Sequence, residues 1–361
     1  MSLIDHILDY DSESLSQRLK KMGMPSYLVN QIFDWIYCKR IFDIDQWSNI
    51  SLTNREKLKS EFSFSIPKIV WNSTSKDGTT KFLIGFKDGH QVEMVIISSL
   101  KRRTLCLSSQ VGCAIGCTFC HTGTQGLTRN LSTHEVVLQF LLASSWLKDD
   151  EGSESKISNI VYMGMGEPLH NFENMKMATK IFLDPKGLGL GQRRITLSTS
   201  GLVPQIEKLD EFPPVNIAIS LHSANDEVRS ELMPLNRAYD IKRLFQAIEK
   251  IPLKAFRRIT YEYILIRDLN DSEEDIRALV SLLNKKESKV NIIPFNEFPG
   301  SRFKKPADAL VEWFCESLNK RGLVATVRVT KGDDILAACG QLKSLATKKP
   351  SKLPGFSSIE S

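Results

Sequence analysis

The sequence predicts an α/β protein in which parallel βα units form the main part of the chain. From about residue 104 onward, short apolar runs alternate with amphipathic segments at helical spacing. Before residue 63 the apolar residues recur at helical spacing alone, and two short strand-like segments lie between these two regions. We therefore expect a helical domain, a β-hairpin and a set of βα units, in that order.

The helical domain is predicted over residues 1–68. Between residues 14 and 62, apolar positions recur at helical spacing and charged side chains fill the positions between them. Ser51 precedes a further stretch of this kind and has a side chain typical of a helix N-cap. We expect these segments to form one small helical module.

The β-hairpin is predicted within residues 69–100, as an extension of the main domain. Its strands are expected at residues 81–86 and 91–97. The four residues between them, Lys87 to His90, contain Asp88 followed by Gly89, which is a strong signal for a hairpin turn.

The βα units are predicted over residues 101–345. Alternation of strand and helix at this spacing is typical of parallel βα units. The strands are expected at residues 104–107, 157–163, 194–198, 215–221, 259–265, 289–293 and 324–329. Helices are expected between most of them, for example at residues 133–147, 241–250, 273–284 and 307–320. The polar tail, residues 346–361, is expected to be disordered.

The composition is that of an ordinary globular protein. The 361 residues are 42% hydrophobic and 25% charged, and no apolar run approaches the roughly 20 residues of a membrane-spanning helix. The acidic residues near the N-terminus do not suit a signal peptide. Seven cysteines, an odd number, suit a reducing compartment better than an exported disulfide framework. We expect a cytoplasmic protein with no membrane association. Its net charge of +6 permits nucleic acid binding without requiring it.

Three cysteines in one short segment are the strongest chemical signal. Cys113, Cys117 and Cys120 lie beside Gly112 and Gly116, as expected for a loop around an inorganic centre. A zinc ion or an iron–sulfur cluster normally takes four ligands, so three thiolates leave one position open for chemistry. An iron–sulfur cluster is favoured. Packed core cysteines and a zinc site completed by the following histidine are the alternatives.

The spacing from Cys113 to Cys120 resembles the signature of the radical S-adenosylmethionine (SAM) enzymes. In that superfamily three cysteines hold a 4Fe-4S cluster, and the free iron binds the amino and carboxylate groups of SAM. The reduced cluster splits SAM into methionine and a 5′-deoxyadenosyl radical. The resemblance implies that six βα units form an open, partial (β/α)6 radical SAM barrel, with functional groups at the carboxyl ends of its strands.

Polar residues follow several predicted strands and are the candidates for SAM binding. The glycine of the pair Gly166 and Glu167 lets the backbone approach a ligand, and the carboxylate can accept a hydrogen bond from an ammonium group. After a loop of this cysteine spacing, the pair resembles the motif that holds the SAM amino group. The further candidates are Ser198, Ser220, Leu221, His222 and Asn296.

Further segments resemble the RlmN/Cfr family of radical SAM methyltransferases, which act on adenosine in RNA. They are residues 105–113, 164–169, 196–201, 220–222, 233–234, 293–296 and 337–342. The resemblance covers nearly the whole chain and is weakest before residue 60. It implies a 4Fe-4S cluster on the three loop cysteines and two molecules of SAM per turnover.

The resemblance also assigns roles to two cysteines outside the cluster loop. The C2 and C8 carbons of adenine are electrophilic, so they cannot simply attack a SAM methyl group. In this family the methyl is first placed on a cysteine, here Cys339, as S-methylcysteine. Its methylene radical then adds to adenine and forms a protein–RNA crosslink. Attack of Cys106 on the Cys339 sulfur releases the methylated RNA and leaves a transient disulfide.

Glu93, in the second strand of the hairpin, matches the catalytic glutamate of the family. The resemblance implies that it is a proton acceptor, and burial would raise its pKa toward neutrality. The sequence does not decide whether Glu93 or Cys106 removes the proton from the adduct.

The family acts on 23S rRNA at the peptidyl transferase centre and, in its RlmN branch, also on tRNA next to the anticodon. Pro168, Ser200 and Phe298 match the RlmN branch, which methylates C2, rather than the Cfr branch, which methylates C8. The helical domain and basic residues such as Arg102 and Arg103 are expected to hold the RNA. A reductant of the flavodoxin or ferredoxin type and a monomeric state are also expected.

Two functions of other classes stay open at this point. A radical SAM activase or maturase would need the cluster but not Cys106 and Cys339. A zinc-dependent RNA-binding protein would hold zinc at the three loop cysteines. Cys38 and Cys315 match no family motif and are expected to be structural.

Overall fold

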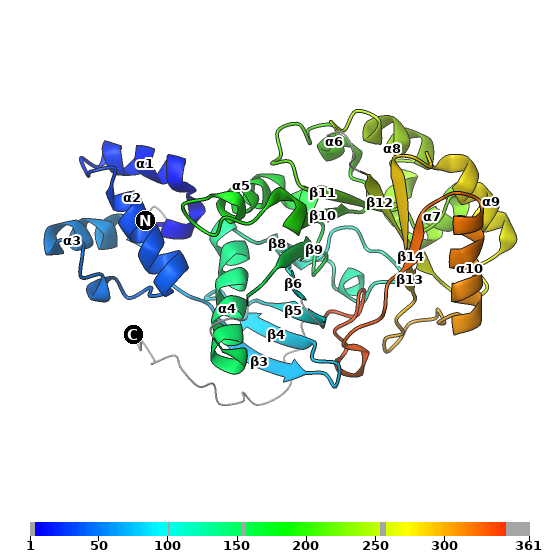
Figure 1. The fold of residues 1–361 in the computed structure, drawn as a ribbon, viewed down its shortest axis with the longest axis horizontal. Coiled ribbons are helices and arrows are strands. Elements are labelled where there is room, and N and C mark those ends of the chain that lie inside the picture. The colour runs from blue at the N-terminus through cyan, green and yellow to red at the C-terminus, as the bar shows by residue number, and fades with distance from the viewer. Residues whose placement is uncertain (1–3, 100–101, 153–155, 253–257, 344–361) are drawn as a thin grey trace.

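The computed structural model describes residues 4–99, 102–152, 156–252 and 258–343. In this part of the chain, ten strands form one mixed sheet in the order β14-β13-β12-β11-β10-β9-β6-β5-β4-β3 (Figure 1). The strands from β14 to β6 are parallel to one another, and those from β6 to β3 are antiparallel. The predicted α/β class is confirmed.

The parallel strands form an open barrel. They are β6 (Arg102–Cys106), β9 (Asn159–Tyr162), β10 (Ile195–Thr199), β11 (Asn216–Ser220), β12 (Ile259–Leu265), β13 (Ser288–Pro294) and β14 (Ala325–Val327). The central residues of β11, Ile217 to Ile219, are apolar and buried whichever face they point to, as expected for a parallel strand covered by helices. Since β14 ends the strand order without pairing to β6, the barrel does not close. Six βα units with β14 as a further strand confirm the predicted partial barrel.

Helices follow the parallel strands and cover the outside of the sheet (Figure 1). Ser132 and Glu135 form a capping box at the start of α4, in which each side chain accepts the backbone N–H of the other residue. Ser272 and Asp275 start α9 in the same way. The helices are α4 (Thr133–Glu151), α5 (Phe172–Leu183), α6 (Val203–Ile206), α7 (Asp226–Leu232), α8 (Ile241–Ile248), α9 (Glu273–Leu282) and α10 (Asp308–Lys320).

The predicted hairpin is present, but it is part of a larger extension. β4 (Thr80–Gly85) and β5 (Gln91–Ser99) pair around the turn, where Gly89 has a φ of +84°. A third strand, β3 (Lys68–Thr74), pairs with β4 and was not predicted, because its half-exposed residues show no clear apolar alternation. On the other side β5 pairs with β6, Val95 opposite Cys106. The extension therefore continues the barrel sheet.

The N-terminal residues form the expected helical module beside the barrel (Figure 1). It contains α1 (Ser12–Lys21), α2 (Leu28–Phe33), which continues as one π-helical turn over Asp34–Lys39, and α3 (Leu52–Glu61). The short strands β1 (Asp5–His6) and β2 (Phe62–Ser63) pair at its base. The module contacts α4: the ring of His6 stacks on that of His134 with centroids 4.3 Å apart, and Asp9 accepts a hydrogen bond from the His134 N–H.

The chain after β14 packs against the antiparallel extension, where the Gly332 N–H donates to Asp77, and against the cluster loop, where the Thr122 hydroxyl donates to the Leu342 carbonyl. We call residues 331–343 the strap; it contains the short helix Asp333–Ile335 and carries Cys339. The tail that was predicted to be disordered lies outside the described residues. None of the helices in the described ranges has the length and apolarity that crossing a bilayer requires.

Candidate active site

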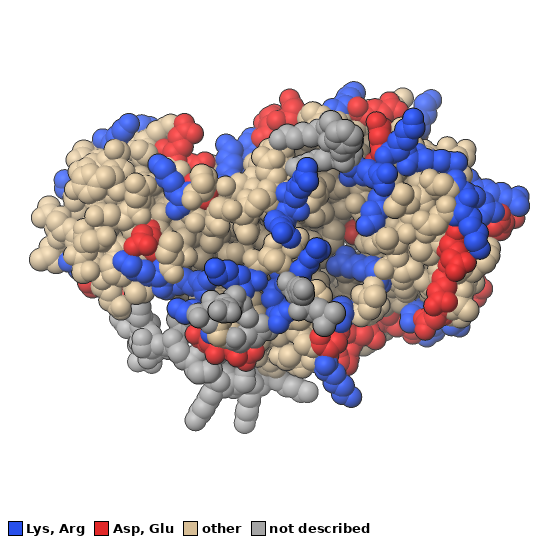
Figure 2. All heavy atoms as spheres, in the orientation of Figure 1, with Lys and Arg blue, Asp and Glu red and all other residues tan. Residues whose placement is uncertain are grey.

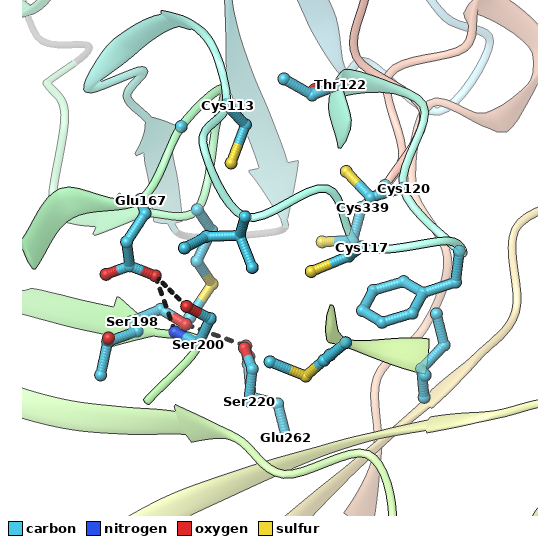
Figure 3. A pocket seen from close by; sticks show the side chains of 18 of the residues that line it. Cys113, Cys117, Cys120, Thr122, Glu167, Ser198, Ser200, Ser220, Glu262 and Cys339 are labelled. Carbon is cyan, nitrogen blue, oxygen red and sulfur yellow. Dashed lines mark hydrogen bonds between the residues drawn. The ribbon is translucent and has the colours of Figure 1, made fainter. Parts of the chain in front are cut away.

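A cavity lies at the carboxyl ends of β9 to β13, and the three loop cysteines line it (Figure 3). The sulfur atoms of Cys113, Cys117 and Cys120 point toward its interior in this view. The other predicted SAM-binding residues that line it are Gly166, Glu167, Ser198, Ser220 and His222. Strand ends far apart in the sequence thus meet at one site, as expected for a barrel.

The cluster loop is held by a small hairpin and by the barrel wall. β7 (Gln110–Gly112) pairs with β8 (Leu127–Asn130), and the N–H of Cys113 donates to the Gly126 carbonyl at 2.9 Å. Gly112 has a φ of +75°, and a Cβ there would lie 1.8 Å from the Gly126 oxygen. Only glycine fits this position. The N–H of Thr118 donates to the Leu232 carbonyl and ties the middle of the loop to α7.

The three thiols suit a soft metal centre. Burial raises the pKa of Cys113 to about 12 and raises the pKa of Cys117 well above its ordinary value, an effect that the neighbouring thiols increase. As free side chains these thiols stay protonated, and an iron cluster would bind them as thiolates. All three thiols line the same cavity, and three thiolates are the donor set that a 4Fe-4S cluster with one open iron position takes.

His121 does not complete a metal site with these cysteines. Its ring stacks on Phe298 with centroids 4.8 Å apart, and its backbone N–H donates to the Gly340 carbonyl at 2.7 Å. Its Nδ1 atom is buried without a hydrogen-bond partner among the described residues. The zinc alternative thus lacks its expected fourth ligand in this arrangement.

Glu167 is buried and fixed by its neighbours. Its Oε2 atom accepts hydrogen bonds from the backbone N–H and the hydroxyl of Ser200, both at 2.7 Å, and Oε1 accepts the Leu169 N–H at 3.0 Å. Burial raises the pKa of Glu167, and the bonds from Ser200 act against this shift. Gly166 has a φ of +100°, and a Cβ there would lie 2.5 Å from the Gln110 Cβ atom. The carboxylate is thus presented to the cavity in one orientation.

Glu262, on β12, lines the cavity and was missed by the sequence analysis. The Ser198 hydroxyl donates to its Oε2 atom at 3.1 Å. Its Oε1 atom is buried, makes no hydrogen bond to the described residues and lies 3.7 Å from the Arg328 guanidinium. A glutamate among apolar β residues is itself a signal in the sequence, because a buried carboxylate needs a partner.

Two of the residues predicted to bind SAM, His222 and Leu221, are buried and make contacts within the protein. Burial lowers the pKa of His222 to about 3, and its neutral Nδ1 atom accepts the Ile264 N–H at 3.1 Å. Leu221 is buried and does not line the cavity, so it can offer a ligand only its backbone.

Arg229, also missed from the sequence, is fully buried. It donates to the carbonyls of Ser200 and Leu221, which joins the ends of β10 and β11.

A second cavity adjoins the first and contains both of the other predicted cysteines. Cys106 and Cys339 line it together with Arg328, and Cys339 also lines the first cavity. The Arg328 guanidinium contacts the Met163 sulfur at 3.4 Å. All seven cysteines are free thiols, so the expected transient disulfide is not formed here. Burial raises the pKa of Cys106 to about 12 and raises that of Cys339, where Arg328 acts in the opposite direction.

Asn296 and Glu93 lie outside the first cavity. The side-chain amide of Asn296 donates to the Cys339 carbonyl at 3.1 Å, and Asn296 lines the second cavity. Glu93 lines neither cavity. Its carboxylate is buried beneath the strap, 3.2 Å from the Lys81 ammonium, and accepts the Lys343 N–H at 2.9 Å. Burial raises the pKa of Glu93, and Lys81 acts against this shift.

Comparison with known proteins agrees with this architecture. Residues 107–280 match the radical SAM superfamily, and residues 6–63 match the N-terminal domain of a ribosomal RNA large subunit methyltransferase. The crystal structure of a radical SAM methyltransferase from Sphaerobacter thermophilus superimposes with a TM-score of 0.87 at 40% identity, over 94% of this chain and 99% of that one. The fold is that of a radical SAM enzyme.

Proteins with similar sequences show which family of radical SAM enzymes this chain resembles. The dual-specificity RNA methyltransferase RlmN of Jannaschia sp. (strain CCS1) is 44% identical over 332 residues, 90% of this chain and 84% of the relative. The RlmN of a Nitratiruptor species is 44% identical over 94% of this chain and 97% of its own. The chain belongs to the RlmN family of radical SAM RNA methyltransferases. Membership disfavours the activase, maturase and zinc-protein alternatives.

Proposed function

We propose that this enzyme methylates the C2 carbon of adenosine in 23S rRNA, at the peptidyl transferase centre, and in tRNA next to the anticodon. The relatives are named as dual-specificity RNA methyltransferases. The observation that carries the proposal is the position of Cys339. It borders both the cavity of the cluster loop and the cavity that contains Cys106. A methyl carrier needs access to a methyl donor on one side and to the acceptor and the resolving thiol on the other.

The cavity residues would hold the cofactors. Cys113, Cys117 and Cys120 would bind a 4Fe-4S cluster. With SAM bound, this cluster would supply the electron that generates a 5′-deoxyadenosyl radical. Glu167 would accept hydrogen bonds from the SAM ammonium group, and Ser198 and Ser220 offer hydroxyls beside it. Two molecules of SAM would be used in each turnover, one for the methyl group and one for the radical.

The cysteines would carry the methyl group. The Cys339 thiolate would take a methyl from the first SAM, forming the S–CH₃ bond and releasing S-adenosylhomocysteine. Transfer of one hydrogen atom from this methyl to the 5′-deoxyadenosyl radical would give 5′-deoxyadenosine and a methylene radical, which adds to the adenine C2 carbon and crosslinks enzyme and RNA. The adduct radical would then lose one electron, back to the oxidised cluster, and one proton, to Glu93 or Cys106. Attack of Cys106 on the Cys339 sulfur would release methylated RNA and form the disulfide, which two electrons from a flavodoxin- or ferredoxin-type reductant would reopen.

Pro168, Ser200 and Phe298 support C2 rather than C8 as the methylated carbon, because they match the RlmN branch. Methylation of C8 in 23S rRNA is the alternative. The target base has to leave its stack to reach Cys339. Lysine and arginine side chains surround the central hollow of the face in Figure 2, which supports binding of an RNA backbone there.

The test is an anaerobic reaction of the iron-reconstituted protein with SAM, a reductant and unmodified RNA. The nucleosides are then identified by mass spectrometry against 2-methyladenosine and 8-methyladenosine. We expect 2-methyladenosine, and none with Cys106→Ala or Cys339→Ala; Cys315→Ala is the matched control. Formation of 8-methyladenosine would agree with the proposed mechanism but would show that the methylated carbon is C8 rather than C2. SAM cleavage without either product would mean that the substrate is wrong.

A further inference from the structure

The strap is anchored at several points around Cys339. At its start, the Gly332 N–H donates to Asp77 in the β3–β4 turn at 3.0 Å. Near its end, the Leu342 carbonyl accepts the Thr122 hydroxyl of the cluster loop at 2.6 Å. Between these points, a buried ion pair of the antiparallel extension contacts the strap on both sides of Cys339.

This ion pair joins Lys81 of β4 to Glu93 of β5, with Nζ and Oε1 3.2 Å apart. Both side chains are less than one tenth exposed, 8% and 7%. The Lys81 ammonium also donates to the Leu336 carbonyl at 3.1 Å, and the Glu93 carboxylate accepts the Lys343 N–H at 2.9 Å. One contact thus precedes Cys339 in the chain and the other follows it.

A buried ion pair is a weak source of stability, because removing two charges from water costs about as much as their attraction returns. Its value lies in the geometry that it fixes. Leu336 has a φ of +53°, which is unfavourable for a leucine and persists only where surrounding contacts hold the backbone. The hydrogen bond from Lys81 to its carbonyl is one such contact. Lys81 therefore contacts the part of the strap before Cys339 directly. It acts on the part after Cys339 through Glu93.

We propose that Lys81 is a positioning residue, which holds the strap so that the Cys339 sulfur stays at the junction of the two cavities. The inference rests on the proposed role of Cys339 as methyl carrier. Lys81 lines neither of the two cavities. Its effect on the reaction passes through the strap and through Glu93, and so it couples the proposed proton acceptor to the methyl carrier.

The first test measures the strap itself. Hydrogen exchange of the peptide covering residues 331–343 is followed by mass spectrometry in cluster-free protein, without SAM or RNA. We expect Lys81→Met to speed this exchange by about tenfold, since opening the strap then breaks fewer bonds. Lys81→Arg should restore most of the protection. The matched control is Lys176→Met, because the Lys176 ammonium also has two acceptors, the carboxylates of Glu173 and Glu211, but lies on α5.

The second test measures coupling in reconstituted enzyme, as methyladenosine formed per SAM cleaved. Lys81→Met should lower this ratio by about tenfold while radical cleavage of SAM continues. With the Cys339 sulfur misplaced, the radical forms but does not lead to methylated adenosine. A merely structural role would lower both rates together. Lys81→Arg should recover the ratio, and Lys176→Met should leave it unchanged.

Lys81→Met leaves the Glu93 charge unpaired, which works against folding of this variant. The double variant Lys81→Met/Glu93→Gln removes both charges, and the same fast exchange is expected from it. Protected strap peptides in both variants, or an unchanged coupling ratio, would overturn the inference. Absence of methyladenosine from the wild-type enzyme would instead refute the proposed function, and the exchange result would be unaffected.

Discussion

The carboxylate of Glu262 and the guanidinium of Arg328 lie 3.7 Å apart, yet they line different cavities. Glu262 faces the cavity of the cluster loop, where Ser198 donates to it. Arg328 faces the cavity of Cys106 and Cys339. The pair is thus a charged contact between the proposed SAM site and the proposed site of methyl transfer.

Glu262→Gln should weaken SAM binding. The amide keeps the shape of the carboxylate but not its charge, and the unpaired Arg328 guanidinium would then repel the positive sulfonium of SAM. We expect the Kd for SAM to rise about tenfold, or about 1.4 kcal/mol, in equilibrium dialysis with reconstituted protein. Glu316→Gln, which removes a surface charge paired with Lys320, is the control. Equal affinity in wild type and Glu262→Gln would rule out this role.

Cys106→Ala should trap the protein–RNA crosslink. If Cys106 is the resolving thiol, as proposed, the adduct on Cys339 then has no route to release. A slow band containing both protein and RNA should appear on denaturing gels after an anaerobic reaction. Cys339→Ala cannot form the adduct and should give no such band. A crosslink in Cys339→Ala would identify a different carrier residue.

Gly332→Ala should loosen the start of the strap. Gly332 has a φ of +68°, and a Cβ there would lie 2.8 Å from the Ala337 Cβ and 2.9 Å from the Thr79 Cγ2 atom. We expect a loss of unfolding free energy of about 1–3 kcal/mol, from backbone strain and crowding together. Urea unfolding measures it.

Gly23→Ala is the matched control for this substitution. Gly23 has a φ of +70° with no atom within 4 Å of the added Cβ, so its substitution carries the backbone strain alone. Equal losses for the two variants would show that crowding at the strap contributes nothing.

Acidification should destabilise the contact between the helical module and the barrel. Burial, and then the neighbouring His134, lower the pKa of His6 to about 4. The unfolded chain binds a proton near pH 6.5 and the folded chain does not, so this stability is complete above pH 6.5 and is lost as the pH falls toward 4. Between pH 7.5 and 5.5 the loss should be about 1 kcal/mol. His6→Gln should remove this part of the pH dependence in urea unfolding. A His6→Gln curve as steep as the wild-type curve would contradict it.

Reversal of charge at Arg102 and Arg103 should weaken RNA binding without preventing SAM cleavage. Arg102 is exposed at the start of β6, where it can reach a phosphate. In the double Glu variant, the dependence of log K on log salt concentration should become shallower, because fewer counterions are released. Arg277→Glu, on the exposed face of α9, is the control. An unchanged affinity and slope would exclude this surface.

The sequence predicted the structure well where a residue pattern is typical of only one kind of structure or site. Strand and helix positions followed from apolar periodicity, and the cluster loop from three cysteines at fixed spacing. β3 was missed because its side chains are half-exposed and do not alternate clearly. The buried charged residues that hold the backbone around the site were also missed. Arg229 and Lys81 are ordinary surface residues by type, and only the folded chain shows that they are buried and which carbonyls they contact.

The unbroken hydrogen bonding from β3 to β14 sets the limits for building chimaeras of this enzyme. A segment spanning β3 to β5 cannot be exchanged as an independent unit, since β5 pairs with the barrel strand β6 and the segment carries both charges that contact the strap. The helical module, in contrast, meets the barrel through side chains rather than through a shared sheet. Chimaeras that exchange the helical module should therefore join the chains ahead of β3.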